Sequence, residues 1–374
     1  MNTVQKISIL ADSAKYDTCA SSASSRKIKT NDRIGNVAAG GICHSFTQDG
    51  RCISLYKTLY SNSCSFDCKY CTNSTGCNKR RATYKPEELA KVFMALYIRN
   101  YVEGLFLSSA VVRDPDFTTQ RMIDTVRILR EKYKFMGYIH FKIIPGTSYE
   151  LIKQATEFSD RLSVNLEAPN KSRLSEISDV KDFHIDILRR QRWIKNMKIP
   201  SGQTTQLVVG ASDETDNELL KMVNWEYDNF NLKRGYYSAF LPVPNTPLET
   251  KNKTPLLREH RLYNVDFMIR KYGIPLKDFT SIMDNGMLPG CDPKVALAEQ
   301  TLDGPVDVNE SSFDDLIRVP GIGQLSAKRI MGFRKSQMIK KYEQLHNIGV
   351  VLKRAKPFIK VNGVCQKRLG DFCA

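Results

Sequence analysis

The chain has 374 residues, of which 41% are hydrophobic and 26% charged, so it can form two or more domains and has the composition of a soluble globular protein. Lysine and arginine outnumber aspartate and glutamate by 56 to 40, and the formal charge of +16 favours a polyanionic partner. No apolar run is long enough for a membrane span or a signal peptide, so we expect a cytoplasmic protein with no membrane partner. In such a protein, the ten cysteines indicate metal or redox chemistry rather than disulfides.

Residues 1–52 are predicted to be an N-terminal extension, and their pattern is the hardest to interpret. In this extension Cys43 and Cys52 bracket a segment that contains His44. These residue types would suit a second metal site. We favour the simpler interpretation that the two cysteines are small buried hydrophobic residues.

Residues 53–245 alternate between strand and helix patterns. Six such units predict parallel strands joined by right-handed crossovers, which is a partial (β/α)6 barrel of the TIM type. An open doubly wound sheet is the competing architecture. A helix that Thr118 and Thr119 cap is expected to run through Leu129. The predicted strands cover residues 53–60, 105–110, 138–144, 162–168, 205–210 and 235–241, and the other helices 86–100, 183–197, 214–230 and a segment from Ser148.

The loop after the first predicted strand contains Cys64, Cys68 and Cys71, with three and then two residues between them. Thiolates are the soft ligands that hold iron–sulfur clusters, and such clusters normally take four. Three ligands would leave one iron open for chemistry, just as a catalytic zinc keeps an open position. The alternative is a zinc-binding loop with Cys77 as the fourth ligand, although the second cysteine pair typical of such loops is not found.

This cysteine spacing, with the aromatic Tyr70 directly before the last cysteine, resembles the signature of the radical S-adenosylmethionine (radical SAM) enzymes. The resemblance implies a [4Fe-4S] cluster on Cys64, Cys68 and Cys71, whose open iron chelates the amino and carboxylate groups of SAM. Reduction of the cluster then cleaves SAM to methionine and a 5′-deoxyadenosyl radical. The electron would come from a donor such as flavodoxin or ferredoxin, and Tyr70 would lie beside the adenine.

The active site of either α/β architecture lies at the carboxyl ends of the strands, and polar residues gather there in the sequence. The resemblance implies that Glu167 binds the two ribose hydroxyls of SAM, although a surface salt bridge is an equal alternative. After the second strand the family usually has Gly-Gly-Glu, where this chain has Leu107-Ser108-Ser109-Ala110. For Gly210 the alternative is that it is only a turn residue. The SAM contacts implied in this way are Tyr70, Ser108, Ser109, Asn165, Glu167 and Gly210.

Residues 246–304 are predicted to be a helical connecting segment, with an amphipathic helix over residues 257–272. Residues 305–364 are then expected to form an all-α domain, and residues 365–374 a tail. In this domain a helix over 308–317 precedes the tight turn Val319-Pro320-Gly321-Ile322-Gly323 and a helix over 326–333. A degenerate second copy follows, with helices over 342–345 and 352–358 on either side of a turn at Gly349.

The two copies resemble a paired helix-hairpin-helix domain, which binds the DNA backbone without reading its sequence. Glycines let the backbone come close to another surface, and a helix N-terminus presents free N–H groups to an anion. Residues 305–362 contain eleven Lys or Arg and five Asp or Glu, which agrees with a phosphate partner. The alternative is a helical hairpin that contacts protein. The implied DNA contacts are Gly321, Ile322, Gly323, Ser326, Lys328 and Gly349.

The order of the two motifs, with the stretches Tyr138–Gly146 and Gln206–Ala211, resembles a family of radical SAM proteins assigned to DNA modification or repair. That family is associated with uracil-DNA-glycosylase-like partners. We therefore expect a radical SAM enzyme that modifies or repairs a nucleotide in DNA. The alternatives are an RNA (tRNA) modification enzyme and a DNA-binding iron–sulfur redox sensor without turnover.

Overall fold

The computed structural model describes residues 1–14, 42–46 and 52–365. The chain divides into two compact units, which are described separately below. The first comprises Met1–Glu214 and Lys221–Pro255, and the second comprises Thr215–Leu220 and Leu256–Ala374. Across the described residues, no helix is long and apolar enough to cross a membrane.

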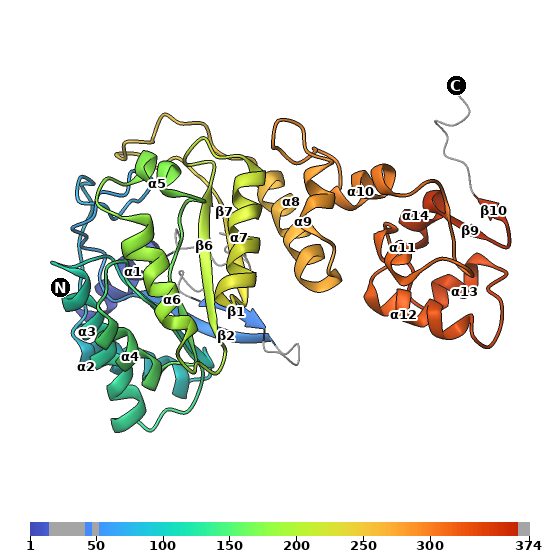
Figure 1. Ribbon diagram of the computed structural model, residues 1–374. Coiled ribbons are helices and arrows are strands. Elements are labelled where there is room, and N and C mark those ends of the chain that lie inside the picture. Colours follow the sequence, from blue (N-terminus) through green and yellow to red (C-terminus); the bar gives the residue numbers. More distant parts are fainter. Residues whose placement is uncertain (15–41, 47–51, 366–374) are drawn as a thin grey trace, which may run out of the picture. The chain divides into compact units, whose positions relative to one another are not determined.

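A seven-stranded sheet in the order β1 to β7 forms the centre of the first unit (Figure 1). The strands β2 to β7 are all parallel, and β1 pairs antiparallel with β2 at the edge. Because the strand order never reverses, right-handed crossovers place every connecting helix on the same face, as in a barrel. The predicted partial barrel is therefore confirmed, and the doubly wound alternative is wrong. The strands are β1 (Ile42–Phe46), β2 (Cys52–Leu59), β3 (Gly104–Ser108), β4 (Ile139–Lys142), β5 (Arg161–Ser163), β6 (Gln203–Val209) and β7 (Arg234–Ala239).

The helices between these strands pack side by side along the outer face of the sheet, with α2 against α3, α3 against α4 and α4 against α6 (Figure 1). Two of them begin with a short π-helical turn or continue into one. The bounds are α1 (Thr3–Ala14), α2 (Pro86–Ile98), α3 (Pro115–Arg127, continued by a π-turn over Ile128–Lys132), α4 (Tyr149–Phe158), α5 (Lys171–Ile177), α6 (Arg189–Lys195, preceded by a π-turn over Phe183–Leu188) and α7 (Asp216–Phe230).

Helix α3 starts earlier than predicted. Its N-cap is Asp114, whose side chain accepts a hydrogen bond from the Phe117 N–H, and Pro115 occupies the first helical position. Thr118 and Thr119 are buried inside the helix, where Thr118 Oγ1 donates to the Val112 carbonyl. The prediction that these two threonines cap the helix is therefore wrong.

The N-terminal extension contributes α1 and β1, neither of which the sequence pattern predicted. Cys43 is buried in β1, where it packs with Leu55 and Phe106, as expected for a small hydrophobic residue. Cys52 is exposed, so the same prediction is wrong for this residue. The side chain of His44 lies outside the part of the chain that the structure describes.

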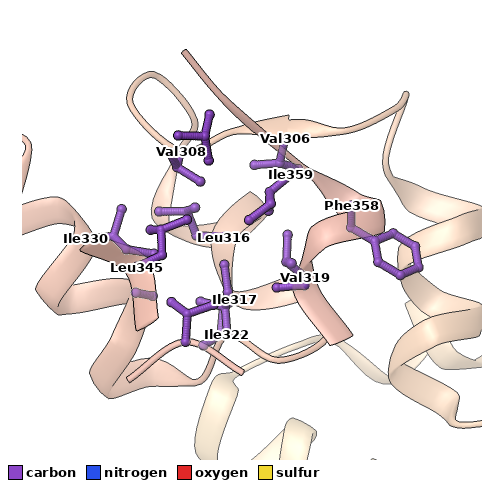
Figure 2. Close-up of a cluster of buried hydrophobic side chains, with 14 of the residues drawn as sticks. Val306, Val308, Leu316, Ile317, Val319, Ile322, Ile330, Leu345, Phe358 and Ile359 are labelled. Carbon is purple, nitrogen blue, oxygen red and sulfur yellow. The ribbon is translucent and has the colours of Figure 1, made fainter. Parts of the chain in front are cut away.

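The second unit is mainly helical, and its two helical hairpins share a hydrophobic core (Figure 2). Buried side chains from both predicted helical hairpins meet there, among them Leu316, Ile330 and Leu345. Besides the expected helices, the unit contains a short sheet in the order β10-β9-β8. Its strands have only two or three residues each, which is too short for a strand pattern to be recognised in the sequence. The elements are α8 (Leu256–Phe267, continued by a π-turn over Met268–Tyr272), α9 (Leu276–Thr280), α10 (Pro293–Thr301), β8 (Val306–Asp307), α11 (Phe313–Arg318), α12 (Gln324–Phe333), α13 (Tyr342–Asn347), α14 (Leu352–Ala355, continued by a 3-10 turn over Lys356–Phe358), β9 (Ile359–Val361) and β10 (Val364–Cys365).

Candidate active site and hairpin pair

A pocket of about 210 Å³ opens in the first unit at the carboxyl ends of the strands. The structure brings most of the predicted site residues together around this pocket. Gly210 is the exception, because it is not among the lining residues and its N–H donates to Glu214 Oε1 at 2.5 Å. Its φ of +84° fits the alternative of a turn residue. The predicted residues that line the pocket are Cys64, Cys68, Tyr70, Cys71, Ser108, Ser109, Asn165 and Glu167.

Backbone N–H groups of neighbouring residues surround the thiols of the cysteine loop. The N–H groups of Phe66 and Val111 each lie 3.4 Å from Cys64 Sγ, and that of Asn73 lies 3.4 Å from Cys71 Sγ. Hydrogen bonds to sulfur stabilise thiolates and help set the reduction potential of an iron–sulfur cluster. The donor set of this loop therefore fits such a cluster.

The thiols of Cys68 and Cys71 hold their protons more strongly than usual as long as no metal binds them. Burial raises the pKa of Cys71 to about 12, and the charge of nearby Cys68 adds to the rise. Burial also raises the pKa of Cys68, with Lys181 partly offsetting it. Since metal ligation requires the thiolate, loading a cluster onto this loop must release protons.

The arrangement does not suit a single zinc ion. Across the described residues, no group of three His, Cys, Asp or Glu could hold one metal ion. A cubane differs because it offers a separate iron to each thiolate, so its ligands need not meet at one point. Cys77 Sγ lies 3.1 Å from the Asn245 carbonyl oxygen, and Cys77 is not among the pocket residues. This is evidence against the zinc loop with Cys77 as its fourth ligand.

Glu167 has a strained backbone at the mouth of the pocket. Its φ is +65°, a left-handed conformation that costs a non-glycine residue about 1–3 kcal/mol and is often found at functional sites. Hydrogen bonds on both sides hold it, since its N–H donates to the Gln206 carbonyl and its carbonyl accepts from the Val208 N–H. The carboxylate is buried and accepts from Lys181 Nζ at 3.3 Å, so the salt bridge exists but is not a surface one.

Lys181 is a pocket residue that the sequence analysis missed. Desolvation lowers its pKa, but Cys68 and Glu167 outweigh that effect and hold the pKa above its usual value. Asp67 of the cysteine loop fixes the segment before Lys181, since its carboxylate accepts from Ser178 Oγ at 2.8 Å and from the Asp179 N–H at 2.9 Å. Lys181 lies in a polar stretch of the sequence that is typical of a solvated loop, so no local signal marked it.

Tyr70 is a half-buried, neutral phenol in this pocket. Burial raises its pKa, and the nearby Glu167 carboxylate raises it further. Ser108 is buried at the end of β3, and Ser109 Oγ donates to the Ala110 carbonyl at 2.6 Å. Asn165 Nδ2 reaches Glu167 Oε2 at 3.4 Å. The pocket therefore combines three thiols, one carboxylate, the two ammonium groups of Lys142 and Lys181, and several neutral polar groups.

In the second unit, the two hairpin turns pack directly against each other. The Val351 N–H donates to the Gly321 carbonyl at 3.0 Å, and Ser326 Oγ donates to the Gly349 carbonyl at 2.8 Å. Gly321 and Gly349 both have left-handed backbones, with φ of +87° and +92°. A Cβ on Gly321 would lie 2.5 Å from the Val351 carbonyl oxygen, so this glycine is needed for the pairing of the hairpins.

The other predicted contact residues divide between core and surface. The side chain of Ile322 is fully buried, whereas Lys328 is exposed on α12. Gly323 is the N-cap of α12 and no side chain caps this helix end. The Ile322 carbonyl accepts from Lys294 Nζ at 2.5 Å, which places a second basic group directly behind the turn. The N-terminus of α12 is thus an uncapped helix end with basic residues nearby.

Two family descriptions match the chain. Residues 58–225 match the radical SAM superfamily and residues 303–355 match the helix-hairpin-helix motif. The first match includes the cysteine loop, Glu167 and Lys181, and the second includes α11, both turns and α12. No curated protein matches the sequence.

Several solved structures resemble part of the chain. The FeFe-hydrogenase maturase HydG from Carboxydothermus hydrogenoformans aligns at 13% identity and a TM-score of 0.48, over 57% of this chain and 50% of that one. Methylornithine synthase (PylB) aligns at 16% identity and a TM-score of 0.48, over 57% and 61%. Coproporphyrinogen III oxidase (HemN) from Escherichia coli aligns at 14% identity and a TM-score of 0.40, over 58% and 53%. The chain therefore spans about half to three fifths of the length of these proteins.

Proposed function

We propose that this chain modifies or repairs a nucleotide in DNA. The premise is that it joins a domain of the radical SAM enzyme superfamily to a helix-hairpin-helix motif. Membership of the superfamily implies a [4Fe-4S] cluster and SAM, as the cysteine spacing led us to expect. The observation that carries the proposal is that one chain contains both a thiol-lined pocket and a motif that suggests non-specific DNA contacts.

The pocket residues divide into those that hold the cluster and those that orient SAM. When bound, the two cofactors supply a carbon-centred radical that removes a hydrogen atom from the substrate. In the proposal Cys64, Cys68 and Cys71 hold the cluster. Glu167 accepts hydrogen bonds from the ribose hydroxyls, and Lys181, whose Nζ lies 3.3 Å from Glu167 Oε1, holds that carboxylate in place. The other SAM contacts proposed are Tyr70, Ser108, Ser109 and Asn165, which line the same pocket.

Removal of either partner of the Glu167–Lys181 pair is expected to weaken SAM binding. Glu167→Ala loses hydrogen bonds of the charged kind, each worth about 1.5–3 kcal/mol, so we expect SAM affinity to fall by about tenfold or more. Lys181→Met also leaves a buried carboxylate unpaired, which typically costs about 3–5 kcal/mol of stability. Calorimetry of SAM binding, with iron content measured in parallel, tests both variants.

The matched control for Lys181→Met is Lys69→Met. Lys69 pairs with Asp179 at 3.1 Å, but the Asp179 side chain is exposed to water, so this pair is expected to contribute little. If Glu167→Ala binds SAM as tightly as the parent protein, Glu167 has a structural role only.

The DNA part of the proposal rests on the second unit. The uncapped N-terminus of α12 offers backbone N–H groups to a phosphate, and Lys328 on the same helix adds charge. Contacts of this kind do not read the base sequence. A base stacked in a duplex is out of reach of an enclosed pocket, so the target nucleotide must be extruded or single-stranded.

The remaining partners and the location are proposed from the family resemblance and from the chemistry of the cluster. Because the cluster must be reduced, we propose an electron donor such as flavodoxin or ferredoxin in the cytoplasm. The resemblance also supports an association with a uracil-DNA-glycosylase-like protein.

Two measurements separate this proposal from its alternatives. SAM cleavage by the reduced, reconstituted protein would distinguish an enzyme from a redox sensor. Competition between duplex DNA and transfer RNA over a range of salt concentrations would distinguish the two substrates, since phosphate contacts give a steep salt dependence. We expect SAM cleavage and a preference for DNA. Tighter binding of transfer RNA would favour the RNA-modifying alternative.

A further inference from the structure

The inner face of the sheet is basic below the SAM pocket. The pocket residues Leu59, Ser108 and Lys142 identify this face on β2, β3 and β4. Side chains alternate along a strand, so the residues two positions earlier, Lys57, Phe106 and His140, point to the same side. Their contacts agree, since Lys57 Nζ lies 5.4 Å from the centre of the Phe106 ring, and the Phe106 and His140 rings lie 4.4 Å apart.

Strand register extends this face across the barrel. His140 is opposite Arg161 on β5, and its Nε2 lies 2.9 Å from Ser163 Oγ, which places Arg161 and Ser163 on the inner face. Ser163 is opposite Thr204 on β6, and Thr204 is opposite Arg234 on β7. The resulting cationic belt consists of Lys57, Lys142, Arg161 and Arg234, with the imidazole of His140 in the same face of the sheet.

Hydrophobic residues lie on one side of the cationic belt, and the acidic group Glu167 lies on the other side, at the carboxyl ends of the strands. Below it, Cys43, Ile53, Leu55 and Phe106 form a buried hydrophobic cluster that closes the barrel. Among the strands that the structure describes, the inner face carries no Asp or Glu before Glu167, which already pairs with Lys181.

Several polar groups of this face have no protein partner in the described part of the chain. Lys57 is only 5% exposed, and among the described residues its ammonium group has no hydrogen bond or ion pair and lies 5.4 Å from the centre of the Phe106 ring. Thr204 Oγ1 and Arg161 Nε are buried and have no hydrogen-bond partner. Burying such groups costs free energy unless something else pairs with them. A ligand of opposite charge would remove that cost.

We propose that the cationic belt binds an oxyanion, namely a phosphate group of the substrate nucleotide, inside the barrel below the SAM pocket. Guanidinium, ammonium and hydroxyl donors that converge from several strands are the groups that recognise phosphate. Lys142 belongs both to the belt and to the SAM pocket, so an anchored phosphate would hold its nucleotide next to the reactive centre. Arg234, Tyr236 and Ser238 on the inner face of β7 are partly exposed, which leaves the belt accessible from that side.

This inference rests on the proposed function and makes it more specific, because it states that the substrate carries a phosphate group that the protein binds. Two sources share that chemistry, namely a nucleotide extruded from DNA and a free nucleotide. In either case the phosphate, and not only the base, enters the barrel.

The test uses the full-length reconstituted protein with calorimetry of inorganic phosphate, the four deoxynucleoside monophosphates, their nucleosides, and a single-stranded trinucleotide. We expect the phosphate-bearing probes to bind on the order of tenfold or more tightly than the nucleosides, and Lys57→Met to remove that advantage. The control Lys91→Met removes the same charge from the exposed face of α2 and should change nothing. Arg161→Met gives a second and independent variant.

Thermal unfolding shows whether the variants remain folded. Lys57→Met keeps the apolar stem and loses an unpaired buried charge, so its melting temperature should equal or exceed that of the parent. Lys57-dependent binding of monophosphates identifies a free nucleotide, and Lys57-dependent binding of the trinucleotide alone identifies DNA. If no phosphate-bearing probe depends on Lys57 or Arg161, the belt is not a phosphate site. If these probes do depend on them but DNA is never a substrate, the belt stands and the DNA proposal fails.

Discussion

Replacement of any one of Cys64, Cys68 and Cys71 by alanine is expected to abolish both the iron–sulfur absorbance and SAM cleavage. In the proposed arrangement each thiol would hold a different iron of the cluster and the fourth iron would stay open for SAM, so no spare ligand would remain. The parent protein, reconstituted without oxygen, should contain about four irons per chain, as a cubane requires. Iron analysis, absorbance and SAM turnover on the same samples measure the effect.

Cys77→Ala is the matched control for these variants. The thiol of Cys77 contacts the Asn245 carbonyl and Ser74 Oγ and does not line the pocket, so its loss should leave the cluster and SAM cleavage intact. Loss of the cluster in Cys77→Ala would show a fourth protein ligand and contradict the open iron.

Gly321→Leu is expected to abolish DNA binding because it breaks the pairing of the two hairpins. Any Cβ at this position meets the Val351 carbonyl at 2.5 Å, and the left-handed backbone is unfavourable for leucine. Overpacking of this kind and strain together cost several kcal/mol, enough to disorder a small helical domain. Fluorescence anisotropy with labelled DNA measures binding, and circular dichroism measures the helix content.

Substitutions of Gly323 and Lys328 test the contact with DNA without disrupting the fold of the second unit. A Cβ on Gly323 meets only Tyr272 Oη at 3.3 Å, so Gly323→Ala should fold and yet bring a methyl group to the exposed helix end. Lys328→Ala should lower the log–log salt slope of DNA binding by about 0.9 if Lys328 neutralises one phosphate. SAM cleavage without DNA should persist in both variants. Unchanged DNA affinity and salt slope would show that the N-terminus of α12 does not grip DNA.

The strands β2 to β7, most helices and the cysteine loop could be predicted because their signals are local. Short apolar runs, such as residues 105–107 of β3 and 207–209 of β6, and the spacing of the cysteines lie within short windows of sequence. The capping of α3 was predicted wrongly because two threonines and Asp114 are all good caps, and the proline after Asp114 decided between them.

Features that depend on distant contacts could not be predicted. Lys181 is buried only because Asp67 draws its loop onto the cysteine loop. Lys57 belongs to a largely apolar strand, where a single lysine gives no signal until the register places it in one row with Phe106, His140 and Arg161. The role of Gly321 was predicted as a close approach to DNA, whereas its nearest neighbour is the second hairpin.

The central claim is that the radical formed in the pocket acts on a nucleotide of DNA. Transfer of deuterium from deuterium-labelled DNA into 5′-deoxyadenosine tests this claim most directly, because it follows the hydrogen atom itself. The account predicts that 5′-deoxyadenosine made by the reduced, reconstituted protein carries deuterium when labelled DNA is present. Active cleavage of SAM with no deuterium transferred from labelled DNA of any sequence, whether single-stranded or duplex, would contradict it.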